Sequence, residues 1–288
     1  MRASLAACFA LALATSPAAR ADDPKPHVHG GDDAADAGAS GATTDTAKVP
    51  MNEKHNLDAA SPKLHGQDLE LKVGEETAKA YVARVTGKKH RGAVLVFHEW
   101  WGLNDHIKHQ ADELARHGYL ALAIDLYKGQ VATDPKTAGE LMGKLDEVWG
   151  DKVEEAAREW LKTEGKVEKV ATIGWCMGGG QSLRASLHDP KDVWATVIYY
   201  GMPVADVAQL KTLQGPVLGI WANKDGWITP EKVKEFEKAL TEAGIKHEFH
   251  AYDADHAFAN PSNGPKYNGK DAKDAWKKTL SFLDKNAK

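Results

Sequence analysis

Short apolar runs alternate with helical patterns along the chain from about residue 64 onward. Residues 93–97 (AVLVF) form an unbroken apolar run, as expected for a strand covered on both faces. Residues 104–117 then place apolar side chains three and four positions apart, which predicts an amphipathic helix that Gly118 can end. The other predicted strands are 68–73, 79–85, 119–124, 170–174, 193–200, 216–222 and 246–252, and the other predicted helices are 137–148, 152–163, 178–187, 231–243 and 271–283.

This alternation of strands and helices predicts one α/β domain over residues 61–288. Such units imply right-handed crossovers and a mostly parallel sheet with helices on both faces. The strands 68–73 and 79–85 are joined through Gly74, so we expect an antiparallel pair at one edge. No internal repeat and no second domain boundary are visible.

The first 21 residues have the three parts of a secretory signal peptide. Arg2 precedes ten apolar residues, 5–14, and Ala19-Arg20-Ala21 supplies the small residues at a cleavage site. Ten apolar residues are too few to cross a bilayer, which takes about 20. Cys8 suggests a lipoprotein site only faintly, because almost no apolar run precedes it. We therefore predict cleavage near Ala21 and a periplasmic or secreted protein.

Residues 22–60 lack large apolar runs, and we interpret them as a disordered acidic tether. The stretch 22–58 holds eight acidic residues against three lysines, so the rest of the chain is close to neutral within a net charge of −4. This balance gives no sign of a nucleic-acid partner or of stable membrane association. The pairs His27/His29 and His106/His109 lack further ligands in their patterns, so no metal and no cofactor are expected.

The segment 174–178 (GWCMG) ends an apolar strand and opens a helix. This is a nucleophile elbow with Cys176 in place of serine, and the flanking glycines avoid collisions in a strained turn. Gly179 and Gly180 would let the helix start approach the neighbouring strands. The positive end of that helix is expected to lower the pKa of the thiol. Once a signal peptide is removed, Cys176 is the only cysteine, which excludes an intramolecular disulfide.

A base and an orienting acid follow Cys176 in the order typical of this type of fold. Asp225 follows the strand 216–222 and His256 follows the strand 246–252, so both lie at the sheet edge where catalytic groups gather. Asp253 and Asp255 are alternatives to Asp225. The backbone N–H groups of Met177 and Trp100 are the expected oxyanion hole.

Four motifs occur along the chain at 98–104 (HEWWGLN), 125–127 (DLY), 174–179 (GWCMGG) and 256–259 (HAFA). Together they resemble the dienelactone hydrolase family. The resemblance spans roughly residue 68 to the C-terminus and implies an α/β-hydrolase fold, a Cys-His-Asp triad, and ester or lactone hydrolysis through a thioester acyl-enzyme. It also implies that Glu99 helps to deliver the thiolate. A carboxylate beside a thiolate repels it, so Glu99 can help only by accepting a proton, and its pKa should be raised. The alternative for Glu99 is a structural carboxylate.

The chain departs from the family pattern where that family binds a substrate carboxylate. Asn260 stands where an arginine shortly after the catalytic histidine would be expected, and Lys136 is no clear match for the second arginine. Losing a bidentate guanidinium weakens anion recognition. An apolar or aromatic acyl pocket is predicted instead, although some of its aromatic residues are expected to belong to the core. The predicted substrate-binding residues are Trp101, Tyr127, Trp175, Phe258 and Asn260, with Trp100 beside them.

Two other classes of function compete with a hydrolase. One is a non-catalytic binding protein on the same scaffold. The order of Cys176, Asp225 and His256 along the chain is evidence against it. The other is a thiol-redox protein, but once the predicted signal peptide is removed no second cysteine remains to resolve a sulfenic acid. The expected partner is a small-molecule ester or lactone, and we expect a monomer.

Overall fold

The computed structural model describes residues 64–85 and 89–287. The predicted signal peptide and tether lie outside these residues. The strands are β1 (Gln67–Val73), β2 (Glu76–Ala83), β3 (Ala93–Phe97), β4 (Leu120–Ile124), β5 (Val170–Trp175), β6 (Val193–Tyr199), β7 (Val217–Ala222) and β8 (His247–Tyr252). The helices are α1 (Asp105–Arg116), α2 (Pro135–Gly143), α3 (Glu147–Thr163), α4 (Met177–His188), α5 (Val207–Leu210), α6 (Pro230–Ala243) and α7 (Gly269–Asn286), with 3-10 turns at Pro190–Asp192 and Pro261–Lys266.

The strands form one eight-stranded sheet in the order β1-β2-β4-β3-β5-β6-β7-β8. The pairs β1/β2 and β2/β4 are antiparallel and the others are parallel, which confirms the mostly parallel sheet and the antiparallel edge. Phe97 at the end of β3 pairs with Gly174 of β5, and Ala222 at the end of β7 pairs with Tyr252 of β8. The carboxyl ends of these strands therefore meet at one sheet edge, where loops can combine their side chains.

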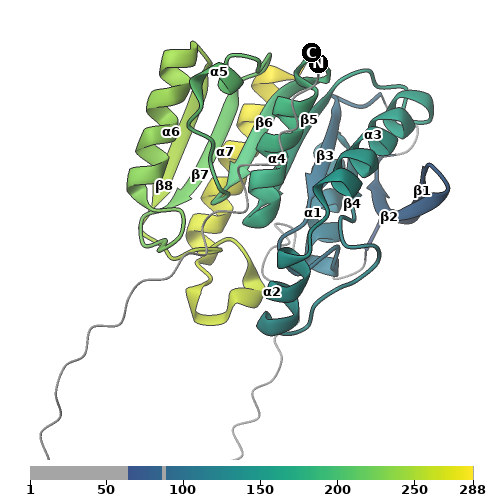
Figure 1. Ribbon diagram of the computed structural model, residues 1–288, viewed down its shortest axis with the longest axis horizontal. Helices are drawn as coiled ribbons and strands as arrows, with labels where there is room; N and C mark the ends of the chain where they lie inside the picture. Colours follow the sequence, from purple (N-terminus) through teal and green to yellow (C-terminus); the bar gives the residue numbers. More distant parts are fainter. Residues whose placement is uncertain (1–63, 86–88, 288) are drawn as a thin grey trace, which may run out of the picture. The chain divides into compact units, whose positions relative to one another are not determined.

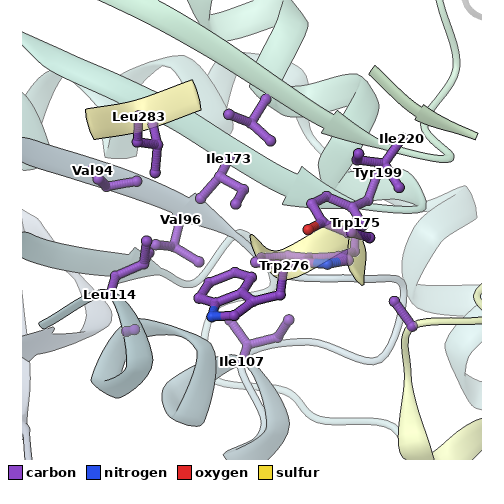
Figure 2. Close-up of a cluster of buried hydrophobic side chains, with 14 of the residues drawn as sticks. Val94, Val96, Ile107, Leu114, Ile173, Trp175, Tyr199, Ile220, Trp276 and Leu283 are labelled. Atoms are coloured by element: carbon purple, nitrogen blue, oxygen red, sulfur yellow. The ribbon is translucent and has the colours of Figure 1, made fainter. Parts of the chain in front are cut away.

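Helices cover both faces of the sheet, as the alternating pattern predicted (Figure 1). On one face α1 and α7 pack against the central strands, and Figure 2 shows Ile107 and Trp276 in this cluster with Val96 and Ile173. On the other face α3, α4 and α6 pack against two further apolar clusters. Within the described residues, every helix is too short or too polar to cross a bilayer.

The segment between β4 and β5 differs from the prediction. The predicted helix 137–148 is interrupted, because α2 ends at Gly143 and α3 begins at Glu147. The Asp146 carboxylate accepts hydrogen bonds from the N–H groups of Val148 and Trp149, so it caps a new helix. The consequence is a single long helix, α3, that runs beside α4.

Candidate active site

Cys176 occupies a strained turn between β5 and α4. Its backbone has φ 55° and ψ −120°, a conformation that ordinary residues rarely adopt. A Cβ atom on Gly174 would lie 1.9 Å from the Gly178 oxygen, and one on Gly178 would lie 2.4 Å from the His98 oxygen. Gly174 and Gly178 are therefore required, because a side chain at either position would collide with the backbone. A Cβ on Gly179 would lie 2.8 Å from the Tyr199 oxygen, which is also too close, whereas a Cβ on Gly180 would have only ordinary contacts, so the expectation for Gly180 was wrong.

Three side chains from three loops meet at this turn. The Nε2 atom of His256 lies 3.1 Å from the Cys176 sulfur, and its Nδ1 atom lies 2.5 Å from Asp225 Oδ2. The other Asp225 oxygen accepts the N–H groups of Trp227 and Ile228 at 2.8 and 3.0 Å. This is the geometry in which an oriented imidazole can take a proton from a nucleophile.

Asp225, rather than the alternatives, is the carboxylate that contacts His256. Burial acts to raise the pKa of Asp225, but the hydrogen bonds from His256 and from the Ile228 N–H outweigh it, and the pKa is lowered. Asp225 therefore stays ionised beside the imidazole. Asp253 points to solvent and pairs with Lys224 at 3.1 Å.

The Cys176 thiol is held in its neutral form in the resting site. Burial and the nearby Glu99 raise the pKa of the thiol to about 12, against the opposing effect of hydrogen bonds from the Met177 and Trp100 backbones. The Met177 N–H at the start of α4 lowers the thiol pKa, as expected, but burial and the Glu99 carboxyl group raise it by more. The expectation of a lowered pKa was therefore wrong. The two N–H groups predicted as the oxyanion hole do converge on the sulfur.

Glu99 is buried beside the thiol, with only 2% of its surface exposed. Burial raises the pKa of Glu99 to about 7, and the amide hydrogen bond from Asn260 partly opposes this rise. The direction is the one that the sequence predicted. Asn260 is itself buried and engaged with Glu99, so it does not line an open substrate pocket as expected.

The loop that carries Glu99 and Trp100 is anchored by a residue that the sequence did not single out for this role. The buried His98 ring accepts the Leu126 N–H at Nε2, 3.1 Å, and its Nδ1 lies 2.6 Å from the Glu99 carbonyl oxygen. These partners fix a neutral tautomer, and burial lowers the pKa of His98. The available signal in the sequence was a polar residue that directly follows the apolar run 93–97 and opens the motif 98–104.

The predicted aromatic set divides between the core and the site. Trp175 stacks with Trp276 and packs against Tyr199 in the core cluster of Figure 2, and Phe258 is fully buried against Tyr200 and Tyr252. The prediction that the Trp175 and Phe258 side chains line the acyl pocket is wrong, because both rings pack in the buried core.

Of the other three aromatic residues, Tyr127 and Trp100 have contacts at the elbow. Tyr127 is buried, but its hydroxyl contacts the Met177 sulfur at 3.0 Å. Trp100 and Trp101 are partly exposed and meet edge to face at 5.1 Å. These residues remain candidates for contact with an acyl or alcohol group.

Trp227 is an additional aromatic residue at the site. Its side chain is 67% exposed, and its ring lies edge to face with His256 at 5.3 Å. The signal in the sequence was an aromatic residue two positions after Asp225. A cavity of about 620 Å³ lies elsewhere, against β1, β2 and the start of α1, and Cys176, Asp225 and His256 are not among its lining residues.

Comparisons with known proteins agree on one family. The model of the "Dienelactone hydrolase family" matches residues 78–287. A relative from Aquifex aeolicus, named "Putative carboxymethylenebutenolidase", is 32% identical over 229 residues, which cover 76% of this chain and 97% of the relative.

Solved structures have the same fold. A structure from Klebsiella pneumoniae named "Putative Dienelactone Hydrolase" is 27% identical with a TM-score of 0.68, and the match covers 76% of this chain and 98% of that chain. A dienelactone hydrolase-like promiscuous phosphotriesterase from metagenomic libraries has a TM-score of 0.70 at 23% identity, covers 77% of this chain and 98% of its own, and supports the fold alone. The chain belongs to the dienelactone hydrolase family and is a hydrolase with the α/β-hydrolase fold.

Proposed function

We propose that the protein hydrolyses carboxylic esters or lactones through a thioester formed on Cys176. The observation that carries this proposal is the contact series from the Cys176 sulfur through His256 to Asp225, at 3.1 and 2.5 Å. The Met177 and Trp100 N–H groups add a place for the negative charge that develops on the substrate oxygen.

The reaction starts from a neutral thiol. His256 Nε2 takes the thiol proton as the sulfur attacks the carbonyl carbon, and the tetrahedral oxyanion is held by the two N–H groups. The C–O bond then breaks, and the imidazolium returns the proton to the departing alkoxide. Water attacks the thioester with His256 as the base, the acid leaves, and the sulfur regains a proton.

Glu99 affects this cycle in two ways: its negative charge repels the thiolate, and its carboxylate can accept a proton. At neutral pH a group with a pKa of about 7 is present in both forms. The ionised form can accept the one thiol proton in place of His256 and pass it through His256 to the departing alkoxide. While Glu99 holds that proton its charge is gone, which removes the repulsion that raises the thiol pKa. Glu99 therefore supports thiolate formation when a substrate covers the site.

The substrate class is an ester or lactone with an apolar or aromatic part. Trp227 beside His256 and the Trp100/Trp101 pair supply aromatic surface at the site. Asn260, in the position where the family resemblance predicted an arginine, is used to hold Glu99. An apolar substrate gains from aromatic contacts, whereas a free carboxylate would lack a bidentate partner there.

An ester and lactone panel tests the proposal. Purified protein under reducing conditions is expected to hydrolyse activated aryl esters, and Cys176→Ala and His256→Ala are expected to lose several orders of magnitude in kcat, since triad members act as a unit. Met202→Ala is a control, because Met202 is an exposed side chain that makes no contact in the triad. Wild-type turnover in Cys176→Ala would refute the proposal.

A further inference from the structure

A ladder of charged side chains links the helices α3 and α4. Arg184 of α4 pairs with Glu147 at 2.9 Å and with Asp151, both from α3. Arg158 of α3 pairs with Asp189 at 2.6 Å, just beyond the end of α4. His188 is the last residue of the 12-residue helix α4, so it lies about 16 Å along the helix axis from the first residue after the elbow, since a helix rises about 1.5 Å per residue.

Glu154 is the unusual member of this ladder. It is fully buried, with 0% of its surface exposed, and neither carboxyl oxygen has a hydrogen-bond partner within the described part of the chain. Its nearest ion-pair partner, Arg158, is 3.6 Å away and is also paired with Asp189. Burying an ionised carboxyl group without hydrogen bonds costs several kcal/mol. Such a group requires either a proton or a cation.

Two further metal-ligating groups converge on Glu154. One ligand atom each from Asp151, Glu154 and His188 lie within 4.8 Å of one another. In a tetrahedral site with bonds of about 2.0–2.1 Å, ligand atoms lie about 3.4 Å apart. Side-chain movements of about 1 Å would therefore bring the three ligand atoms to tetrahedral positions around one ion, with the fourth position left for water. We propose that Asp151, Glu154 and His188 bind a divalent transition-metal cation, with Zn²⁺ as the reference ion, between α3 and the end of α4.

The charges around the site fit a cation of this class. Four carboxyl groups, those of Glu147, Asp151, Glu154 and Asp189, face the guanidinium groups of Arg158 and Arg184. Two negative charges remain when all are ionised, which a divalent cation neutralises. One imidazole and two carboxylates favour Zn²⁺ over Ca²⁺ or Mg²⁺, which prefer oxygen ligands.

Zinc binding by the full chain tests this site. The background carries Cys176→Ser, His27→Ala and His29→Ala, which removes other donors that Zn²⁺ could use. Equilibrium dialysis against Zn²⁺ is expected to give one bound ion in this background. Adding Glu154→Gln or His188→Ala is expected to weaken that binding at least about tenfold. Glu155→Gln, at an exposed neighbour on α3, is the matched control and is expected to bind as the background does.

Thermal unfolding provides a readout that is independent of catalysis. Zn²⁺ is expected to raise the unfolding midpoint of the background and of Glu155→Gln, but not that of Glu154→Gln or His188→Ala. His188 is partly exposed, so His188→Ala keeps the test valid if Glu154→Gln fails to fold. The proposal is overturned if the background binds no Zn²⁺, or if His188→Ala binds it as tightly as Glu155→Gln.

Discussion

At the residue scale, Glu99 and Cys176 oppose each other's ionisation. The carboxyl group contributes to a thiol pKa of about 12, and burial keeps the carboxyl pKa near 7. Asn260 donates to Glu99 and favours its charged form. The resting site therefore stores a neutral thiol, which is protected from oxidation because the thiolate is the reactive species. In the proposed reaction the thiolate therefore forms by proton transfer within the site, and the sulfur is not permanently ionised.

The variant Glu99→Gln tests two effects of this carboxyl group separately, namely its acceptance of a proton and its repulsion of the thiolate. The wild-type hydrolysis rate is expected to rise with pH through about 7, because Glu99 loses its proton there and can then accept one. In Glu99→Gln this rise is expected to disappear and kcat to fall about 100-fold or more. The rate of iodoacetamide labelling against pH is expected to show a lower thiol pKa in the variant, because the repelling charge is gone. An unchanged pH–rate profile would exclude a role for Glu99 in proton transfer.

Trp227 is expected to favour substrates with an aromatic part. Its exposed ring beside His256 can pack against an aryl group, and such ring pairs contribute about 0.5–1.5 kcal/mol. Trp227→Ala should therefore raise KM for aryl esters about threefold to tenfold and leave KM for short alkyl esters nearly unchanged. Trp227→Phe should retain the preference. Val148→Ala, at an exposed apolar residue on α3, serves as the control. Equal changes for aryl and alkyl esters would contradict this role.

At the element scale, the strands and most helices follow directly from the sequence. The fully buried run of β3 matches its predicted bounds, and the helix cap at Asn104 is where the pattern begins. The boundary between α2 and α3 was predicted at residues 149–151, but it lies at residues 144–146, because the acidic cap Asp146 starts the new helix earlier.

The candidate site was less predictable than the elements that carry it. The elbow and the loops after β7 and β8 are local features, so Cys176, Asp225 and His256 could be named from their spacing. The contact between Asn260 and Glu99 joins residues 161 positions apart, and only the tertiary fold creates it. The direction of the Trp175 ring likewise depends on packing against α7, which no local pattern encodes.

Two glycines of the elbow region give a matched pair of stability tests. Gly174→Ala would place a methyl group 1.9 Å from the Gly178 oxygen, whereas at Gly180 the nearest atom is 3.6 Å away. We expect Gly174→Ala to lower the free energy of unfolding by about 3 kcal/mol or more and to abolish hydrolysis. Gly180→Ala should fold and hydrolyse esters nearly as wild type. Urea unfolding and ester turnover measure both variants, and equal stability of the two would contradict the strained elbow.

At the scale of the whole molecule, the family match begins at residue 78 and ends at residue 287. Residues 1–63 thus lie outside both this match and the described structure. The proposed reaction uses only side chains at the carboxyl edge of the sheet. We propose that the first 21 residues direct export and that residues 22–60 precede the folded domain as a tether.

The mass of the mature chain tests the export proposal. In a bacterium that expresses the full sequence, the protein is expected in the periplasm or the medium with Asp22 as its first residue. Replacing Leu11 and Leu13 with aspartate should prevent processing, because the apolar region is required for export. A full-length chain retained inside the cell would contradict the signal peptide.

The most direct test of the central claim is the intact mass of the protein during turnover of an activated aryl ester with a bulky, slowly released acyl group. Wild-type protein is expected to gain the mass of one acyl group minus one hydrogen, and peptide mapping is expected to place it on Cys176. Cys176→Ala is expected to gain no mass and to lose turnover. Full turnover by Cys176→Ala, or an acyl group attached at another residue during productive turnover, would contradict the account.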